Sequence, residues 1–285
     1  MPATMQERIG ALAGLTAVIS GASRGIGLAI GTALGRAGCN VTLLAKTDAP
    51  HPTLPGTVRT AAEQVGDAGG TALAVVGDVR REEDVERCVE ATLARFGAID
   101  LVVNNASAIA LAPICDLPPS RLALMADVNV RGTFLLTRAC LPALRASRHA
   151  HVLTLSPPLD AVSSWLAGFA PYTLTKMGMT MLTLGLAADE AGHGIAANCL
   201  WPRTFIATAA VRNLLGGDEQ VARSRTPRIV ADAALAILGS DPRLHTGEAL
   251  LDEEALRRVG VTDLDRYRAV ASGGKLATDL FVGSR

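Results

Sequence analysis

Short apolar runs alternate along the chain with longer amphipathic segments, and this rhythm is the main structural signal in the sequence. The apolar runs predict seven strands, at residues 15–20, 40–45, 72–76, 100–104, 151–155, 195–200 and 248–251. The amphipathic segments predict helices directly after the first strand and at 57–68, 81–96, 120–147 and 171–191. Strands that are apolar almost throughout and separated by helices are typical of a parallel sheet covered on both faces. The pattern therefore predicts an α/β fold, a doubly wound Rossmann-type sheet of seven parallel strands with helices on both faces.

The length and the apolar content fit a single domain. The chain has 285 residues, of which 49% are hydrophobic, and this is enough for one large core. We expect one domain over residues 1–285, with its core at 12–252. Residues 203–229 mix arginines, glycines and apolar side chains and are predicted to form a lid over the substrate. Residues 253–285 are expected to form a polar tail whose end, DLFV, docks on a neighbouring surface.

Charge and cysteine usage narrow the classes of partner. Lys plus Arg and Asp plus Glu each number 27, a balance that gives no attraction to nucleic acid or to an anionic membrane surface. The five cysteines are scattered without a C-x-x-C pair, which indicates reduced thiols and a cytoplasmic location. Neither an apolar leader nor a membrane-spanning run is expected. The histidines lack metal-ligand spacing, so no metal site is predicted, and His149 and His151 are expected at an exposed strand end.

A glycine-punctuated turn follows the first predicted strand without a spacer. It consists of Gly21, Gly25 and Gly27 in the sequence GASRGIG, which opens directly into a helical pattern. Glycines at such a turn permit positive φ, let the backbone approach a diphosphate closely and aim helix N-terminal amides at the anion. A tight connection between strand and helix would show the same pattern. The position in the first βα unit, with Ser20 and Ser23 as extra hydroxyl donors, favours nucleotide binding.

Tyr172 and Lys176 stand four residues apart in the predicted helix 171–191, so their side chains share one helix face. A phenol is a poor acid or base at neutral pH, but a neighbouring ammonium favours its phenolate and lowers its pKa. The pair therefore predicts a proton-transfer site, although a solvated helix face would show the same spacing.

Four motifs together resemble the short-chain dehydrogenase/reductase family over residues 12–252: GASRGIG, NNAS at 104–107, DVNVRGT at 127–133 and YTLTK at 172–176. The resemblance implies that an NAD(P) cofactor binds at the carboxyl ends of the strands. The residues that it assigns to the cofactor are Gly21, Ser23, Arg24, Gly25, Ile26, Gly27, Lys46, Asp78, Val79, Asn105, Ala106, Tyr172, Lys176, Pro202, Ile206 and Thr208. Among these, Asp78 and Val79 would bracket the adenine, and Asn105 and Ala106 would lie beside a ribose. Asp78 as a helix cap and the asparagines as partners of turn backbone are the structural alternatives.

The resemblance also implies a catalytic set, from which this chain departs at one position. Tyr172 would be the proton donor or acceptor, and Lys176 would lower its pKa and bind the nicotinamide ribose hydroxyls. Asn129 would bend its helix and hold a water that extends the proton path. The hydroxyl that usually polarises the substrate would follow Ser156, where this chain has Pro157. We therefore expect Ser156 to supply the hydroxyl after a local rearrangement, with Ser163, Ser164 or Tyr172 alone as alternatives. Ser107, where the family usually has glycine, is a second departure.

The end of the second predicted strand favours NADP(H) over NAD. A carboxylate there would bind the adenosine 2′-hydroxyl and repel a 2′-phosphate, but Ala45 and Lys46 occupy that place. Arg24 adds a second cation, whereas Asp48 is the one nearby ribose acceptor.

The substrate expected from the sequence is a small hydrophobic alcohol or ketone, of a fatty-acyl, terpenoid or steroid-like kind. An apolar wall is predicted from Leu159, Trp165, Leu166, Phe169, Phe205 and Leu214. Arg203 near the site would favour an acidic substrate or point to solvent. The family resemblance implies a homodimer or homotetramer. The alternatives are a nucleotide-binding protein with little turnover, in sensing or assembly, and hydratase or epimerase chemistry on the same scaffold.

Overall fold

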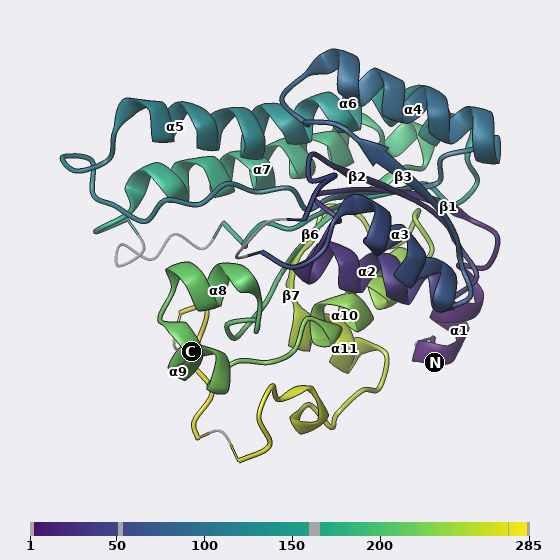
Figure 1. Cartoon of the computed structure of the whole chain (residues 1–285). Helices are drawn as coiled ribbons and strands as arrows, with labels where there is room; N and C mark the ends of the chain where they lie inside the picture. The colour runs from purple at the N-terminus through teal and green to yellow at the C-terminus, as the bar shows by residue number, and fades with distance from the viewer. Residues whose placement is uncertain (1–2, 51–53, 160–165, 273, 284–285) are drawn as a thin grey trace.

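The structure is a computed structural model that describes residues 3–50, 54–159, 166–272 and 274–283. A single sheet runs through the molecule and separates two layers of helices (Figure 1). None of the described helices combines the length and the apolarity that crossing a bilayer requires.

The sheet contains the seven predicted strands. They are β1 Thr16–Ser20, β2 Asn40–Ala45, β3 Thr71–Val76, β4 Leu101–Asn104, β5 His151–Thr154, β6 Ala196–Trp201 and β7 Ala249–Leu251. Their order is β3-β2-β1-β4-β5-β6-β7, and all neighbours are parallel. The order reverses between β1 and β4, and ligands of such sheets bind at this switch point. The predicted doubly wound fold is therefore confirmed.

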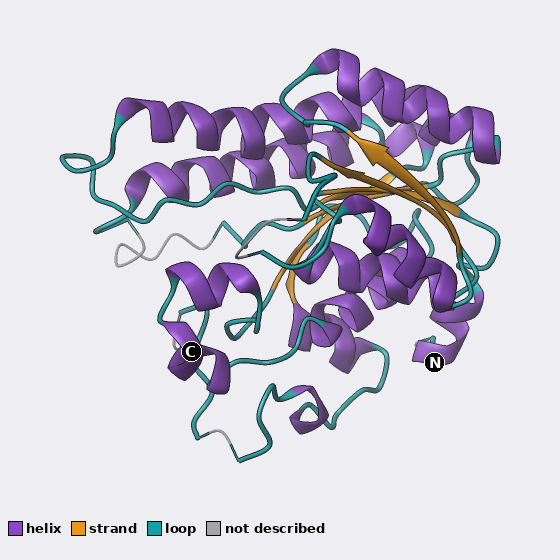
Figure 2. Cartoon of the chain, in the orientation of Figure 1, coloured by secondary structure: helices purple, strands orange, loops and turns teal. Residues whose placement is uncertain are grey.

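Two groups of helices cover the sheet (Figures 1 and 2). One face carries α1 Met5–Gly10, α2 Gly25–Arg36, α3 Val58–Asp67, α10 Arg228–Leu238 and α11 Asp252–Arg258. The other carries α4 Glu82–Phe96, α5 Pro119–Met125, α6 Gly132–Ala146 and α7 Ala170–Asp189. The short helices α8 Ala209–Leu214 and α9 Gly217–Ala222 belong to segment 203–229 and lie beside the carboxyl ends of the strands.

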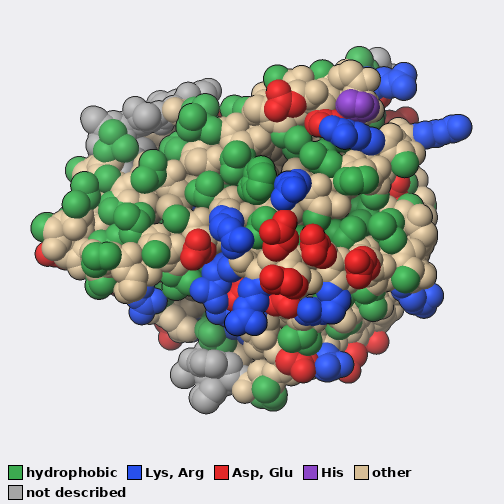
Figure 3. Space-filling model, turned by 90° about the horizontal axis from the view of Figure 1, so that it is seen from above, with side chains coloured by type: hydrophobic (Ala, Val, Ile, Leu, Met, Phe, Trp, Pro, Cys, Tyr) green, Lys and Arg blue, Asp and Glu red, His purple; other side chains and the backbone are tan. Residues whose placement is uncertain are grey.

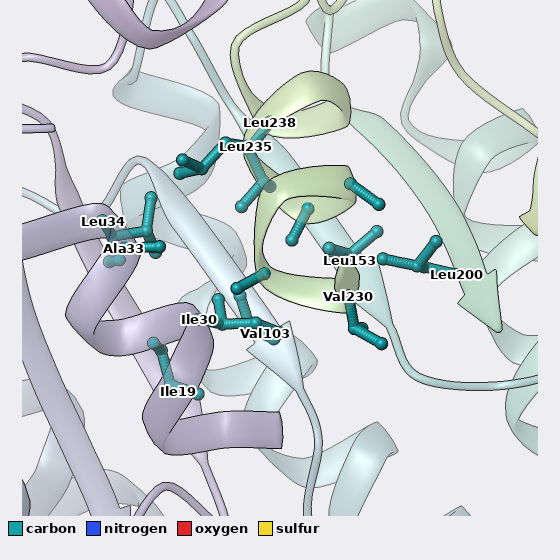
Figure 4. Close-up of a cluster of buried hydrophobic side chains, with 14 of the residues drawn as sticks. Ile19, Ile30, Ala33, Leu34, Val103, Leu153, Leu200, Val230, Leu235 and Leu238 are labelled. Atoms are coloured by element: carbon teal, nitrogen blue, oxygen red, sulfur yellow. The ribbon is translucent and has the colours of Figure 1, made fainter. Parts of the chain in front are cut away.

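The larger core fills the space between the sheet and helices α2 and α10. Ile19 and Leu153 from the strands meet Ile30, Leu34 and other side chains from the helices (Figure 4). Helix α2 can approach closely because Gly31 faces Leu43, whose side chain would lie 3.1 Å from an added Cβ. Shortening Leu34, which is fully buried, to alanine is expected to cost about 2–5 kcal/mol.

The predicted helix 120–147 is not one regular α-helix. Between α5 and α6 the backbone forms a π-helical turn, η1, at Ala126–Arg131. Asn129 lies in this turn, where its Oδ1 accepts a hydrogen bond from Ala108 N (2.7 Å) and its Nδ2 donates to Ala108 O (3.0 Å). These tertiary bonds explain why apolar periodicity did not reveal the distortion.

The C-terminal segment returns to the carboxyl end of the sheet. DEEALRR is helical as predicted, in α11. Beyond it, Thr204 and Thr278 form an antiparallel bridge, and Trp201 Nε1 donates to Leu280 O at 2.8 Å. Phe281 and Val282 are buried, which confirms the predicted docking of DLFV.

Candidate active site

The glycine turn after β1 requires glycine for steric reasons. Gly21 and Gly25 have φ values of 65° and 59°, in the left-handed region that side chains with a Cβ rarely adopt. A Cβ on Gly21 would lie 2.8 Å from Ala106 Cα. A Cβ on Gly27 would lie 2.4 Å from Asn105 Nδ2 and 2.8 Å from Gly21 O. The turn is therefore a bare-backbone cradle at the start of α2, which is what a diphosphate needs.

Ser20 and Asn105 tie this turn to the end of β4. The Ser20 hydroxyl accepts from the backbone amides of Asn105 and Ala106, each at 3.1 Å. In return Asn105 Nδ2 donates to Ser20 O at 2.9 Å and Gly21 O at 3.0 Å. The side chain of Asn105 therefore holds the turn, as the structural alternative predicted, while its residue also borders the cavities described next.

A cavity of about 310 Å³ opens beside the turn, at the ends of β1, β2, β3 and β4. Asp78 lines it with Val79, and its carboxylate forms an ion pair with Arg80 at 2.6 Å. Hydrogen bonding from Arg80 holds the pKa of Asp78 below its usual range, so the group is an ionised acceptor. The other predicted residues in the lining are Gly21, Ser23, Lys46, Asn105 and Ala106.

Two charged side chains follow β2 and differ in their partners. Lys46 lines the cavity, and no described carboxylate pairs with it. Asp48 is held by Arg59, with Oδ1 2.6 Å from Nε. Arg24 donates to Gly56 O at 3.1 Å and borders a separate hollow of about 620 Å³ with Gly25. Of the two cations predicted near a 2′-phosphate, Lys46 is the one that borders the 310 Å³ cavity.

A second cavity, of about 190 Å³, contains the predicted proton-transfer pair. Tyr172 and Lys176 project into it from α7 and are 4% and 2% exposed. Lys176 Nζ donates to Leu155 O at 2.6 Å and lies 4.9 Å from the centre of the Trp201 ring. Asn105 and Ser107 border both cavities, so the two adjoin. Ile26, Pro202, Ile206 and Thr208 complete the predicted residues in its lining.

Burial dominates the electrostatics of this pair. Desolvation lowers the pKa of Lys176 to about 7. It raises the pKa of Tyr172 strongly, the Asp279 carboxylate raises it further, and the Ser107 hydroxyl, which donates a hydrogen bond to the phenol oxygen, opposes both. The phenol pKa is thus raised by burial and by Asp279, and not lowered as the sequence suggested. The ammonium of Lys176 is directed to Leu155 O and the Trp201 ring.

Ser156 does not border the cavity that contains Tyr172 and Lys176. It is fully buried, and its Oγ has no hydrogen-bond partner of normal geometry among the described atoms. It faces the Cys199 thiol, whose pKa is raised by burial and lowered in part by Ser156. Ser163 and Ser164, the other predicted candidates, lie outside the described residues, as does Trp165. Asn129 is buried behind the site, where its Nδ2 also donates to Thr175 Oγ1 at 2.9 Å.

Two polar groups that the sequence analysis did not assign border the cavity. They are Ser107, at a position where the family usually has glycine, and Asp279, the first residue of the C-terminal DLFV. Their proximity to Tyr172 depends on contacts between segments far apart in the chain, so no local pattern revealed it.

The predicted apolar wall is only partly present around this cavity. Phe205 lines the cavity, but Leu159, Leu166 and Leu214 are 45%, 48% and 62% exposed and do not. Leu215 takes the place expected for Leu214.

Two charged positions also differ from expectation. Arg203 points neither to a substrate nor to open solvent, because its guanidinium pairs with Glu253 and Glu254, each at 3.4 Å. His151 is 1% exposed and not at an exposed strand end, since its Nε2 bonds Ser240 O at 3.0 Å. The described residues contain no cluster of three or more potential metal ligands.

Comparison with known proteins identifies the family of the chain. A family model described as short chain dehydrogenase matches residues 15–217, which include the glycine turn and the Tyr172–Lys176 pair. The chain belongs to the short-chain dehydrogenase family. As a family member it is an oxidoreductase that uses a nicotinamide dinucleotide.

Among curated relatives of this short-chain dehydrogenase, hydroxysteroid dehydrogenase-like protein 2 of Xenopus tropicalis is 46% identical over 278 residues. The human protein of that name is 44% identical over the same length. The match covers 98% of this chain but only 66% of either relative, and 52% of the rat protein.

Solved structures show the same fold over nearly the whole chain. A short chain dehydrogenase from Mycobacterium thermoresistibile is 48% identical, covers 96% of each chain and has a TM-score of 0.90. A crystal structure from Xanthomonas campestris is 46% identical, covers 96% of this chain and 99% of its own, and has a TM-score of 0.92.

Proposed function

We propose that this short-chain dehydrogenase interconverts a hydrophobic ketone and its alcohol with NADP(H). The observation that carries the proposal is the adjacency of the two cavities: Tyr172 and Lys176 border a small, mainly apolar space that adjoins the nucleotide cavity through Ser107 and Asn105. When bound, the nicotinamide supplies or accepts the hydride.

The chain fits this cofactor at three points. Gly21, Gly25 and Gly27 leave the cradle free of side chains where a Cβ would collide or be strained. Thr208 lies over the start of α2, 3.6 Å from the place of a Cβ on Gly25, and is suited to cover a diphosphate. Lys46 lines the cavity and can bind a 2′-phosphate. The carboxylate of Asp48 forms an ion pair with Arg59 and is therefore not placed to accept from a ribose hydroxyl.

The residues of the catalytic cavity handle the proton. In the reductive direction the phenol of Tyr172 gives its proton to the substrate oxygen, and the raised pKa keeps that proton in place until the oxygen becomes basic. Lys176, whose ammonium is anchored on Leu155 O, is placed to bind ribose hydroxyls and to stabilise the phenolate that remains. Asn129 is proposed as the outer end of the proton path. Ser156 would contribute only if its side chain left the Cys199 thiol.

The walls favour an apolar substrate. Ile109, Trp201, Phe205, Val211 and Leu215 border the cavity, the last two from helix α8 and the turn that follows it. We therefore retain residues 203–229 as the proposed substrate lid, above a core at 12–252. Fatty-acyl, terpenoid and steroid-like carbonyl compounds share the required chemistry.

We also propose a homodimer or homotetramer that forms through helices α5 to α7. Phe134, Leu174 and Met181 on α6 and α7 are 47%, 67% and 64% exposed. Figure 3 shows hydrophobic side chains gathered toward one end of the face seen from above, with mixed charges over its middle. The five cysteines are all free, which supports a reducing, cytoplasmic location.

The test is oxidation of NADPH, followed by its absorbance, with a panel of hydrophobic carbonyl probes such as phenanthrenequinone and isatin. Turnover with at least one probe, and identification of the alcohol product, is the expected result. Cofactor binding without turnover across the panel would support the alternative of a nucleotide-binding protein, and a product formed without net cofactor oxidation would support hydratase or epimerase chemistry.

A further inference from the structure

The C-terminal segment forms part of the catalytic cavity. Residues 277–282 run antiparallel to the chain after β6, with Phe205 N donating to Ala277 O at 3.1 Å and Asp279 N donating to Arg203 O at 3.0 Å. The Phe281 ring lies 5.9 Å from that of Tyr172 and 5.7 Å from that of Trp201, centre to centre. Phe281 has a φ of 66°, a conformation that a residue with a side chain keeps only where surrounding contacts impose it.

This arrangement delivers one carboxyl group, that of Asp279, to the cavity wall. Asp279 is 8% exposed and borders the same space as Tyr172 and Lys176. Its Oδ1 accepts a hydrogen bond from Leu280 N at 2.7 Å. No described donor or cation bonds its second oxygen.

Burying a carboxylate without a partner costs several kcal/mol, so such a group tends to keep its proton. Desolvation raises the pKa of Asp279 to about 7, and the nearby Asp252 carboxyl adds to the effect. The Lys176 ammonium opposes it but forms no ion pair with Asp279. Tyr172, the third titratable group facing Asp279, is neutral at this pH because its own pKa is raised. At and below neutral pH Asp279 therefore presents a carboxylic acid to the cavity.

Among the residues that the structure describes, no serine offers a free hydroxyl donor to the cavity. Pro157 has no hydroxyl, Ser156 faces Cys199, and Ser107 is engaged with the phenol. We propose that Asp279 is a catalytic residue, whose free oxygen carries the second hydrogen-bond donor to the substrate oxygen. The proposal rests on the proposed oxidoreductase function and assigns a further residue to that site.

The reductive step then balances as follows. The hydride adds to the carbonyl carbon, the π electrons of the C=O bond move to the oxygen, and that oxygen takes the proton of Tyr172. Asp279 keeps its own proton and only hydrogen-bonds the oxygen while negative charge develops there. If Asp279 ionises, its carboxylate faces the developing alkoxide and repels it. Reduction should therefore fall as the pH rises through about 7.

The experiment compares Asp279→Asn, which keeps a donor that cannot ionise, with Asp279→Leu, which has none. With phenanthrenequinone as probe, Asp279→Leu is expected to lower kcat by on the order of a hundredfold. Asp279→Asn should keep most of the activity and show a smaller fall in rate above about pH 7, because only Lys176, whose pKa is also about 7, still titrates there. Asp265→Asn, at a side chain 78% exposed, is the matched control and should behave as the wild type.

A second readout does not need turnover. Between about pH 6 and pH 7, where Asp252 with its pKa of about 6 is mostly ionised, the infrared carbonyl band of a protonated carboxyl should be present in the wild type and missing from Asp279→Asn; in the wild type it should fade above pH 7. Absence of that band in the wild type would overturn the inference.

The kinetic outcomes separate the two proposals. If the wild type turns over and Asp279→Leu keeps its rate while Ser107→Ala loses it, Ser107 is the donor and the inference is wrong. If Asp279→Asn keeps the wild-type pH profile, the fall belongs to another group and the inference is also wrong. If the wild type turns over no probe, it is the oxidoreductase proposal that fails, and the role of Asp279 fails with it.

Discussion

Replacing Lys46 by alanine should change the preference of the protein between NADPH and NADH. Lys46 borders the nucleotide cavity at the end of β2, unpaired with any described carboxylate, while Asp48 is occupied by Arg59. An ammonium and a phosphate about 4 Å apart interact by about 4 kcal/mol at an effective dielectric constant of about 20. Dehydration of both groups reduces the net value to about 1.5–3 kcal/mol, as for other hydrogen bonds to charged groups.

This free energy corresponds to a loss of roughly 10- to 150-fold in NADPH affinity. NADH has no 2′-phosphate, so its affinity should change by less than about threefold. The assay is titration of protein or cofactor fluorescence with each cofactor, for the wild type, Lys46→Ala and the control Lys275→Ala. Lys275 is exposed and borders neither cavity, so its replacement should change neither affinity.

An equal loss of affinity for both cofactors, or no loss for either, would refute the assignment of Lys46 to the 2′-phosphate. Asp48→Ala provides a further check, because the structure gives its carboxylate to Arg59 and predicts no effect on NADH binding. Weaker NADH binding in that variant would mean that Asp48 binds ribose hydroxyls after all.

Two other predictions concern the glycine cradle and the buried histidine. Gly27→Ala should weaken binding of either cofactor by at least about tenfold and lower Tm, because its Cβ would lie 2.8 Å from a backbone oxygen that cannot move aside. The control is Gly66→Ala in α3, where a Cβ meets nothing within 4 Å; it should leave cofactor binding intact and raise stability slightly. Equal changes in cofactor affinity and Tm in the two variants would contradict the steric argument. Burial lowers the pKa of His151 from 6.5 to about 3, so stability is present above pH 6.5 and lost as the pH falls below it. By about pH 5 the wild type should have lost about 2 kcal/mol of its free energy of unfolding, measured by urea titration, and His151→Gln should not show this loss. The same loss in both proteins would exclude His151 as the cause.

Much of the fold could be predicted because the strands are buried on both faces. Runs such as 40–45 and 100–104 are mostly apolar, and the structure places them in the sheet within one residue of the predicted bounds. The short helix α1 was missed although Thr4 and Glu7 form a capping box, a signal that is present in the sequence.

What the sequence did not reveal depends on contacts between distant segments. The family resemblance implied a bend at Asn129, but not the bonds to the backbone of Ala108 that hold the π-helical turn. His151 is buried because the end of α10 lies against β5. Asp279 is more than a hundred residues from Tyr172 in the chain. The direction of the phenol pKa also depends on burial, which a four-residue spacing does not specify.

The central claim is that Tyr172 exchanges a proton with a carbonyl oxygen while hydride moves to its carbon. It is tested most directly with NADPH that carries deuterium at the transferred position, by mass spectrometry of the alcohol formed from a carbonyl probe. The wild type should transfer the deuterium to the carbinol carbon. Tyr172→Phe should bind NADPH normally and transfer almost none, whereas Tyr267→Phe, at the other tyrosine of the chain, should transfer it as the wild type does. Deuterium transfer by Tyr172→Phe at the wild-type rate would contradict the account.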